Sequence, residues 1–294
     1  MPSSHSSEAI DVSRISITGH LTSSIWYEAG LSDRAFTTWQ GRLGYAILGP
    51  ILRWAQKRSG SSDFRIVCLQ RHRIIDHLLE RAIEEQGVLQ VVELAAGLSS
   101  RGQRFMKRYA ERGLRYIEAD LEGMVKRKRE MLDRAGLSHP GHVVTECNIL
   151  ERSGAHSLAK MAKQELDPSV PTTFITEGLI NYFPMSDVLS LWSQISEVLN
   201  ETGVGIYLSD NMPDPGEGTG DRNSRYFRKA VRFLGWLTKG KFELHFCSAE
   251  ETKDALLKAG FRGAEIYVPE SFAGQLDMPL SRKPSFLRVI AASA

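Results

Sequence analysis

Residues 91–102 read VVELAAGLSSRG, a short apolar run that passes through small residues into a helix-forming segment. Such a sequence is typical of a strand that turns into a helix, and in a parallel sheet this first turn lies at the carboxyl edge. A nucleotide-like ligand can lie there against exposed backbone N–H groups if residues 95–97 carry nothing larger than a methyl group. Gly97 can also adopt a positive φ without strain. The stretch suits an ordinary tight turn equally well, so by itself it leaves ligand binding open.

The rest of the chain repeats this alternation of short apolar runs and helix-length connectors. The apolar runs lie at residues 89–96, 116–119, 142–147, 172–176 and 204–209. The connectors with helical spacing lie at residues 100–112, 121–135, 153–166 and 185–200. This order predicts βαβ units, and hence an α/β fold with a doubly wound, mostly parallel sheet. In the tail we expect a strand at 242–246, a helix at 249–259 and strands at 264–268 and 286–291.

Two further segments predict helices outside this sheet. Aromatic and aliphatic residues recur at helical spacing over residues 21–56, and a second helical stretch spans residues 67–86. After Asp210, a Pro/Gly-rich loop leads into a basic, aromatic helix at residues 226–237. We therefore predict an N-terminal helical extension or lid over residues 1–86. The remaining residues, 87–294, would form a ligand-binding domain with a helical insert at about 211–240.

Composition excludes several classes of protein. The 294 residues are 42% hydrophobic and 24% charged with a formal charge of +2, which is typical of a globular chain rather than a disordered one. No apolar run reaches the roughly 18 residues that span a bilayer, and the N-terminal residues lack a signal sequence, so we expect a cytoplasmic protein without a membrane partner. Three cysteines without a C-x-x-C spacing predict neither disulfides nor a metal site. The basic residues are dispersed, and the run at 126–129 is interpreted as a solvated helix face, so no nucleic-acid partner is expected.

Asp120 favours ligand binding at the first turn. The run at 116–119 ends in this acid, which follows Gly97 by 23 positions. An acid at the end of the second strand is the expected clamp for the hydroxyls of a ribose, because its two oxygens can accept from both hydroxyls. Asp120 also precedes a predicted helix and could cap it, and one residue can do both.

The ligand indicated by these residues is S-adenosylmethionine. A dinucleotide fingerprint needs glycine at positions 95, 97 and 100, and only Gly97 fits. This disfavours a pyrophosphate and favours a cofactor with adenine and ribose but no phosphate. Glu93 would be a poor neighbour for phosphates, whereas it is compatible with a sulfonium and an ammonium group.

Three separated segments resemble the leucine carboxyl methyltransferase family. They are ELAAGLSSR at 93–101, Asp120 with Leu121 after it, and TEGLINYF at 176–183. The resemblance extends from about Arg71 to the C-terminus and is greatest to the bacterial and fungal branch that includes O-methyltransferases of polyketide pathways. It implies a class I methyltransferase fold, in which a Rossmann-like, mostly parallel seven-stranded sheet carries an N-terminal helical lid.

The resemblance also implies a set of cofactor contacts. Gly97 and its neighbours would cradle the methionine part, Asp120 would hold the ribose, and Asn148 with Ile149 would lie at the adenine. An upstream arginine would pair with the cofactor's carboxylate, and Arg73 is chosen over Arg71. The expected cofactor-binding residues are Arg73, Glu93, Ala95, Gly97, Asp120, Leu121, Asn148, Ile149 and Glu177. Ala95 and Asn148 depart from the family's usual glycine and acid.

The expected activity is transfer of a methyl group to oxygen. The acceptor would be a carboxylate or hydroxyl of a small, largely apolar, polyketide-like metabolite, enclosed by aromatic residues of the lid and the insert; those residues are Trp26, Tyr27, Trp39, Tyr45, Tyr226, Phe227, Phe233 and Trp236. The same aromatic residues fit equally well a purely structural role, in which they pack the lid and the insert onto the rest of the protein. A carboxylate needs no general base, whereas a hydroxyl would be helped by a histidine, for which His20, His72 and His245 are candidates. The alternatives are a protein C-terminal carboxyl methyltransferase, an NAD(P)-dependent oxidoreductase and a silent cofactor-binding protein.

Overall fold

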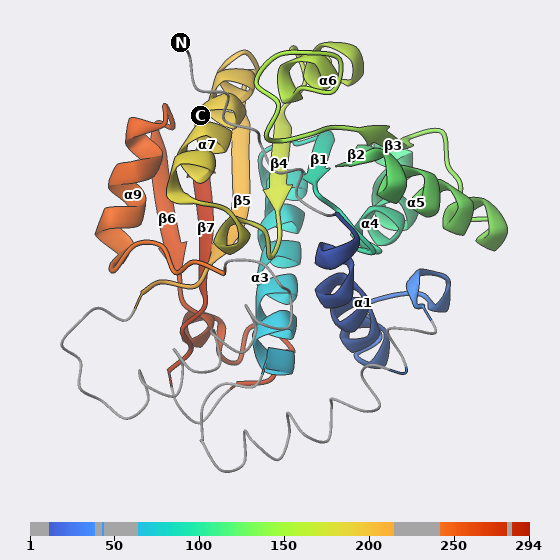
Figure 1. The fold of residues 1–294 in the computed structure, drawn as a ribbon, viewed down its shortest axis with the longest axis horizontal. Helices are drawn as coiled ribbons and strands as arrows, with labels where there is room; N and C mark the ends of the chain where they lie inside the picture. The colour runs from blue at the N-terminus through green and yellow to red at the C-terminus, as the bar shows by residue number, and fades with distance from the viewer. Residues whose placement is uncertain (1–11, 39–42, 44–63, 215–241, 281–283) are drawn as a thin grey trace, which may run out of the picture.

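The fold is built on one twisted sheet of seven strands (Figure 1). The computed structural model describes residues 12–38, 43, 64–214, 242–280 and 284–294. Among them the strand order is β3-β2-β1-β4-β5-β7-β6. The strands are β1 (Gln90–Leu94), β2 (Arg115–Asp120), β3 (His142–Glu146), β4 (Thr172–Thr176), β5 (Gly205–Asn211), β6 (Gly263–Tyr267) and β7 (Arg288–Ser293). The first five pair in parallel and β7 is antiparallel to both β5 and β6, so the predicted doubly wound, mostly parallel sheet is confirmed.

Helices cover both faces of the sheet. The α-helices are α1 (Val12–Glu28), α3 (Phe64–Glu85), α4 (Arg101–Tyr109), α5 (Glu122–Ala135), α6 (Leu158–Glu165), α7 (Met185–Asn200) and α9 (Ala249–Lys258). Short 3-10 turns occur at Arg34–Phe36, Ala110–Arg112, Ile180–Tyr182 and Pro269–Phe272. The predicted helix at 185–200 is confirmed residue for residue, and the helices predicted at 67–86, 100–112, 121–135, 153–166 and 249–259 differ from prediction mainly at their ends. The helical stretch predicted over 21–56 is broken, because α1 ends at Glu28 and a turn follows it. The helix predicted at 226–237 lies outside the described residues.

The expected strand at 242–246 was wrong, because this segment forms no strand. Its backbone groups bond to loops and side chains instead of to a sheet ladder. Glu243 N donates to Asn181 O at 2.8 Å, and the His245 carbonyl accepts from Asn211 Nδ2 at 3.2 Å. The segment therefore crosses the ends of β4 and β5, and an alternating apolar pattern alone could not distinguish this course from a strand.

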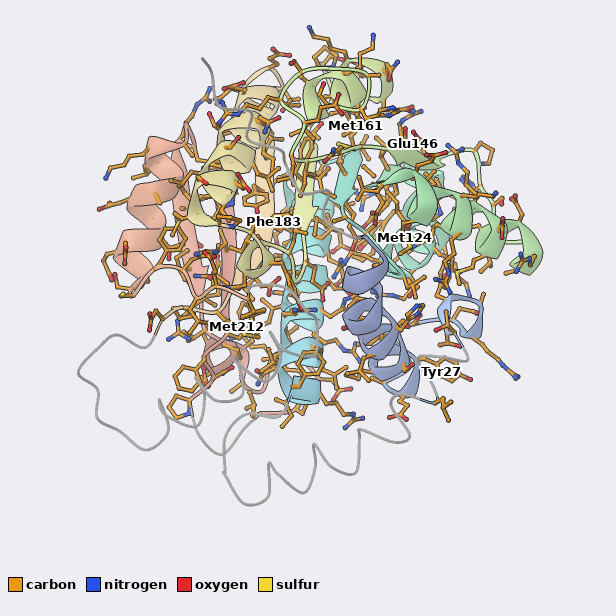
Figure 2. The ribbon with its side chains drawn as sticks, viewed as in Figure 1. Tyr27, Met124, Glu146, Met161, Phe183 and Met212 are labelled. Carbon is orange, nitrogen blue, oxygen red and sulfur yellow. The ribbon has the colours of Figure 1, made fainter. Side chains whose placement is uncertain are left out.

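Each face of the sheet has its own apolar core. Side chains of β1, β4 and β5 pack against α6, α7 and α9 on one face, and Met161 and Phe183 lie in this layer (Figure 2). On the other face α3 and α4 pack against the same strands in a second core. Thus α3, which the sequence places in the N-terminal extension, contributes to one of the two cores that flank the sheet.

The strand order creates a topological switch point at the carboxyl ends of β1 and β4. The chain winds from β1 to β2 on one side, whereas β4 pairs with the other side of β1, so the connections after these two strands diverge. In open α/β sheets such a switch point leaves a crevice at the carboxyl edge. The loops after β1, β2, β3 and β4 all emerge there, and α1 packs beside α3 (Figure 1).

The predicted lid is described only in part. Trp26 in α1 is buried, and its ring lies 4.5 Å from the ring of His72 in α3, whereas Tyr27 is exposed. The remaining aromatic residues named for the lid and the insert lie outside the described residues. In the part of the chain that the structure covers, no helix is long and apolar enough to cross a membrane.

Candidate functional site

The turn after β1 is strained and closely tied to β2. Ala95 and Gly97 both have positive φ values, +51° and +52°. Gly97 N donates to Asp120 Oδ2 at 2.8 Å, which joins the turn to the end of the neighbouring strand. A non-glycine residue rarely adopts this conformation, so Ala95 marks a backbone shape that the surrounding structure imposes.

Asp120 holds the turn but keeps capacity for a ligand. Its Oδ1 accepts from Leu121 N at 2.8 Å, and its Oδ2 accepts from Gly97 N. A carboxylate has about four acceptor positions, so two bonds leave room for two more. Burial raises the pKa of Asp120, and the two backbone donors oppose that rise. Leu121 is the residue that caps α5, so Asp120 bonds to the helix start without being the capping residue.

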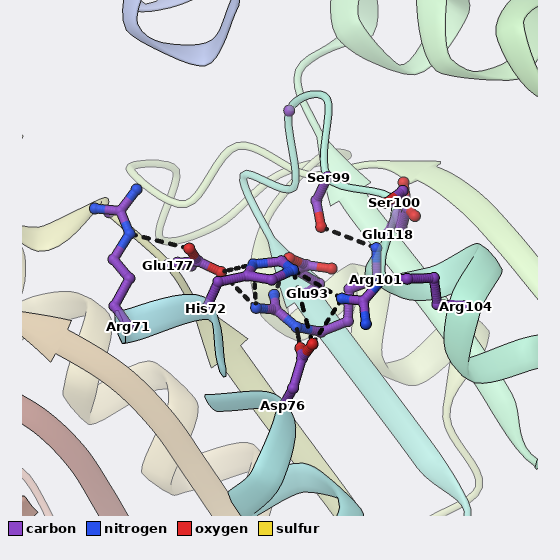
Figure 3. A network of polar contacts seen from close by, with 12 residues as sticks. Arg71, His72, Asp76, Glu93, Ser99, Ser100, Arg101, Arg104, Glu118 and Glu177 are labelled. Atoms are coloured by element: carbon purple, nitrogen blue, oxygen red, sulfur yellow. Dashed lines mark hydrogen bonds and ion pairs between the residues drawn. The ribbon is translucent and has the colours of Figure 1, made fainter. Parts of the chain in front are cut away.

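Glu177, directly after β4, is the centre of a buried set of charges (Figure 3). Its Oε1 accepts from Arg71 Nε at 3.0 Å, while its Oε2 contacts His72 Nδ1 at 2.9 Å and accepts from Arg101 Nη2. Burial raises the pKa of Glu177, but His72, Arg101 and Arg71 outweigh it and hold that pKa well below its ordinary value. Glu177 is therefore a permanent anion at the switch point.

Arg71, rather than Arg73, is the arginine that reaches this edge. The Arg71 side chain is buried, and its Nη1 lies 3.5 Å from Asp210 Oδ2 at the end of β5. A Cβ added to Gly178 would lie 2.6 Å from Arg71 Nη2, so glycine is needed for this approach. Arg73 is partly exposed and its nearest anion is Asp277, at 4.0 Å. The structure thus places Arg71 among the expected cofactor residues and Arg73 away from them, because the two residues lie two positions apart on a helix and so face different sides.

Arg101, at the start of α4, connects Glu177 with further acids on the α3 and α4 face of the sheet. It is fully buried, and its Nε and Nη1 donate to Asp76 Oδ1 at 2.6 Å and to Glu93 Oε1 at 2.5 Å. Tyr116 donates its hydroxyl to the other oxygen of Glu93 at 2.7 Å. Glu93, expected at the cofactor, is thus placed within this set and bonded to protein groups.

We call these groups the buried charge cluster: Arg71, His72, Asp76, Glu93, Arg101, Arg104, Glu177 and Asp210. Arg104 closes it by donating to Asp76 Oδ2 at 2.7 Å. Burial lowers the pKa of His72, although Asp76 and Glu177 oppose this effect, so its imidazole is neutral near pH 7. The cluster then holds one more carboxylate than guanidinium group. This excess favours a cationic ligand at the adjacent edge.

Asn148 and Ile149 follow β3 on the other side of Asp120. Cys147 N donates to Asp120 O at 2.9 Å, which places these residues beside the end of β2. Asn148 Oδ1 accepts from Leu150 N at 3.1 Å, and Ile149 packs on the apolar core next to α6. The structure thus brings the expected adenine residues next to the expected ribose residue.

The candidate histidines differ in their availability. His20 in α1 is half-buried, its Nδ1 lies 2.8 Å from Thr38 Oγ1, and burial followed by the charge of Arg127 lowers its pKa. His245 is buried, with Nε2 bonded to Phe183 O at 2.9 Å, so this nitrogen is occupied. His72 belongs to the buried charge cluster. Among the described residues, no group of three His, Cys, Asp or Glu side chains could hold a metal ion.

Sequence reasoning missed Arg101, Asp76, Asp210 and Lys128. Lys128 was assigned to a solvated helix face, which was wrong, because only 1% of the residue is exposed. A signal was present, since Val125, Lys128 and Leu132 recur at the spacing of one helix face and all three are buried. A charged residue inside such a stripe indicates a buried partner.

Solved structures share this fold. The structure of a candidate methyltransferase from Thermobifida fusca YX covers 99% of this chain and 98% of its own, with a TM-score of 0.63 and 12% identity. A DUF574 family protein from Streptomyces avermitilis covers 94% and 96%, with a TM-score of 0.59 and 10% identity. The structure of PigF with SAH covers 90% and 76%, with a TM-score of 0.52 and 14% identity. The predicted class I methyltransferase fold is confirmed.

The sequence profile of the leucine carboxyl methyltransferase family matches residues 41–196, more than half of the chain. The chain therefore belongs to the leucine carboxyl methyltransferase family. The S-adenosyl-L-methionine-dependent methyltransferase dpfgK of Gibberella zeae is 26% identical over 53% of this chain and 50% of its own length. A candidate methyltransferase of the same description from Streptomyces avermitilis is 33% identical over 48% and 47%. The matches span about half the length of these relatives.

Proposed function

We propose that this protein transfers a methyl group from S-adenosylmethionine to an oxygen atom of a small acceptor. The observation that carries the proposal is the arrangement at the carboxyl ends of β1 and β4. There the Gly97 to Asp120 bond lies on one side of the switch point, and Arg71 with Glu177 lies on the other. The family to which the chain belongs, and the names of its relatives, support the same reading.

The residues at this edge fit the parts of the cofactor. Arg71 provides a guanidinium for a carboxylate, and Glu177 with the excess anion of the buried charge cluster suits an ammonium group. Asp120 has acceptor capacity for ribose hydroxyls, and Asn148 with Ile149 offers an amide and an apolar surface for adenine. When bound, the cofactor supplies a methyl group activated by a positively charged sulfur.

The chemical work of the chain itself is alignment. Methyl transfer needs the nucleophile, the methyl carbon and the sulfur in line, and positioning two bound reactants supplies much of the acceleration. Glu177 and Asp120 are held by two or more hydrogen bonds each, so they stay in place without reorganisation. A carboxylate acceptor needs no proton removed, whereas a hydroxyl would transfer its proton to a neutral histidine such as His20.

We further propose that the acceptor is a carboxylate or hydroxyl of a small, largely apolar, polyketide-like metabolite. Buried Trp26 and exposed Tyr27 of α1, beside α3, support an aromatic wall above the edge. A protein C-terminus is the second candidate acceptor, since the family is named for carboxyl methylation of leucine. An NAD(P)-dependent reaction is disfavoured, because two acids near the switch point, Glu93 in β1 and Glu177 directly after β4, oppose a pyrophosphate.

Methyl transfer with labelled cofactor tests the proposal. The protein is incubated with S-adenosylmethionine carrying a labelled methyl group and with a panel of aromatic acids, phenols and peptides ending in leucine, and Asp120→Ala is the control. We expect label in an acid or phenol product; release by mild alkali identifies a methyl ester, and resistance identifies an ether. Label on nitrogen, on carbon or only on the peptides would contradict the acceptor, and binding of NADH without binding of S-adenosylhomocysteine would contradict the cofactor.

A further inference from the structure

Lys128 in α5 is enclosed at the back of the turn after β1. Its ammonium group donates to Gly97 O at 3.1 Å and to Ser99 O, and it lies 2.7 Å from Glu118 Oε2 in β2. The ring of Phe36 covers it, with 5.1 Å from the Nζ to the ring centre. Two of the three N–H donors of the ammonium group are thus bonded to carbonyl oxygens of the turn, while its charge pairs with the Glu118 carboxylate.

Two of these contacts fix the orientation of peptide groups in the turn. In a trans peptide the C=O and N–H point in opposite directions. The carbonyls of Gly97 and Ser99 are directed at Lys128, so the N–H groups of the next residues, Leu98 and Ser100, point away from it. Gly97 is held at its other end as well, because its own N–H donates to Asp120 Oδ2. Lys128 and Asp120 thus bond to the carbonyl and the N–H of the same residue.

We infer that Lys128 is a positioning residue for cofactor binding, which sets the shape of the turn from 97 to 99 without touching the ligand. This inference rests on the proposed function. An ordinary buried ion pair would need only Glu118, and Glu118 already has a second partner, His142 Nε2, at 3.0 Å. The two carbonyl bonds go beyond that pairing, and both lie in the turn that carries Gly97. Phe36 shields the ammonium group from water, which strengthens each of these bonds.

The test distinguishes an effect of Lys128 on the shape of the turn, and so on cofactor affinity, from its effect on protein stability through the ion pair with Glu118. Lys128→Met removes the donors and leaves the buried Glu118 carboxylate without its cationic partner, with the His142 ring as its remaining contact, which lowers the melting temperature. The double variant Lys128→Met with Glu118→Gln removes that charge too. Lys126→Met, at an exposed position of the same helix, is the matched control. The measurements are the melting temperature and the affinity for S-adenosylhomocysteine by calorimetry.

We expect the double variant to regain most of the melting temperature while its affinity stays roughly 10- to 100-fold below that of the wild type, since two hydrogen bonds to the turn are lost. The control should match the wild type in both measurements. Wild-type affinity in the double variant would overturn the role of Lys128 alone. So would a double variant in which melting temperature and affinity stay low together, because that result indicates a role in the fold. Absence of binding by the wild-type protein would instead overturn the proposed function.

Discussion

The two faces of the sheet bury different kinds of side chain at the same pair of strands, β1 and β4. On the α7 face, β1 and β4 present Val92, Leu94 and Phe174, and the polar groups there are neutral. Thr176 Oγ1 lies 2.6 Å from the Tyr207 hydroxyl in that layer. On the α3 and α4 face the same strands end in Glu93 and Glu177, inside the buried charge cluster. At β1 and β4, the charged side chains among the described residues therefore lie on the α3 and α4 face.

This difference separates groups that stabilise the fold from groups that prepare a site. A buried ion pair is often no more stabilising than apolar residues of similar size, and the α7 face shows that this chain can pack such residues. Among the described residues, desolvated ion pairs lie next to both turns of the expected site: the buried charge cluster around Glu177, and Lys128 with Glu118 behind the turn that holds Gly97. Perturbed ionisable groups concentrated at one edge are typical of functional sites.

The largest effect is expected from Arg101→Met. This change leaves Asp76, Glu93 and Glu177 without their shared partner and should lower the free energy of unfolding by about 3–5 kcal/mol. On the neutral face, Trp192→Phe loses one hydrogen bond to the Tyr207 hydroxyl and some volume, and should cost about 1–2 kcal/mol. Urea unfolding of both variants checks the contrast. A smaller decrease in the free energy of unfolding for Arg101→Met than for Trp192→Phe would contradict the expected difference between the two faces.

The second effect is a dependence of stability on pH that only the charged face produces. Burial raises the pKa of Asp76, but His72, Arg104 and Arg101 outweigh it and lower that pKa from 3.8 to about 2. A lowered pKa contributes stability above the unfolded value, here about 2 kcal/mol, and this is lost as the pH falls from about 4 to 2. The cost of Asp76→Asn should shrink over that range, whereas the cost of Trp192→Phe should not. Unfolding measured from pH 6 to pH 2 would show whether both costs instead stay constant.

A glycine pair gives a smaller test. Gly178 and Gly87 both have positive φ, but only at Gly178 would a Cβ meet a guanidinium, that of Arg71. Either change to alanine should cost about 1–2 kcal/mol of stability. Gly178→Ala should also weaken binding of S-adenosylhomocysteine, and Gly87→Ala should leave it unchanged. Equal affinities in calorimetry would remove Arg71 from the site.

The smallest effect is expected at Ala95. Glycine adopts this positive φ without strain, which stabilises the folded protein, but it also raises the conformational entropy of the unfolded chain. Because the two effects oppose each other, the net change in the free energy of unfolding should stay below about 1 kcal/mol. Affinity for S-adenosylhomocysteine should be retained, because the turn already has this shape. A large loss of affinity in a folded Ala95→Gly protein would show that the methyl group itself contributes to the site.

Much of this fold followed from pattern. The alternation of apolar runs and helical connectors located β1 to β5 within a few residues. The sequence also assigned Gly97 and Asp120 to one site, and the structure places them next to each other, joined by a hydrogen bond that the sequence did not predict. What failed was the side-chain direction on helices. Arg73 was preferred to Arg71, and Lys128 was assigned to solvent.

These failures share a physical cause. A burial pattern identifies which face of a helix is apolar, but it cannot show that a charged residue on that face meets partners from distant parts of the chain. Arg71 meets Glu177 and Asp210, which lie 106 and 139 positions later in the sequence. Alternation in β1 does place Glu93 on the same face as Val91, and in β4 it places Glu177 with Ile175, so the acids were predictable while their partners were not.

The most direct test of the cofactor site is calorimetric titration of S-adenosylhomocysteine into the wild type, Asp120→Ala and Glu122→Gln. Glu122 is an exposed acid two positions after Asp120 and serves as the control. Asp120 anchors Gly97 and offers acceptors to ribose, so its loss should weaken binding by about 1–3 kcal/mol in a protein that still folds. Glu122→Gln should bind like the wild type. Unchanged affinity in folded Asp120→Ala, or no binding by the wild type, would contradict a cofactor site at the carboxyl ends of β1 and β4.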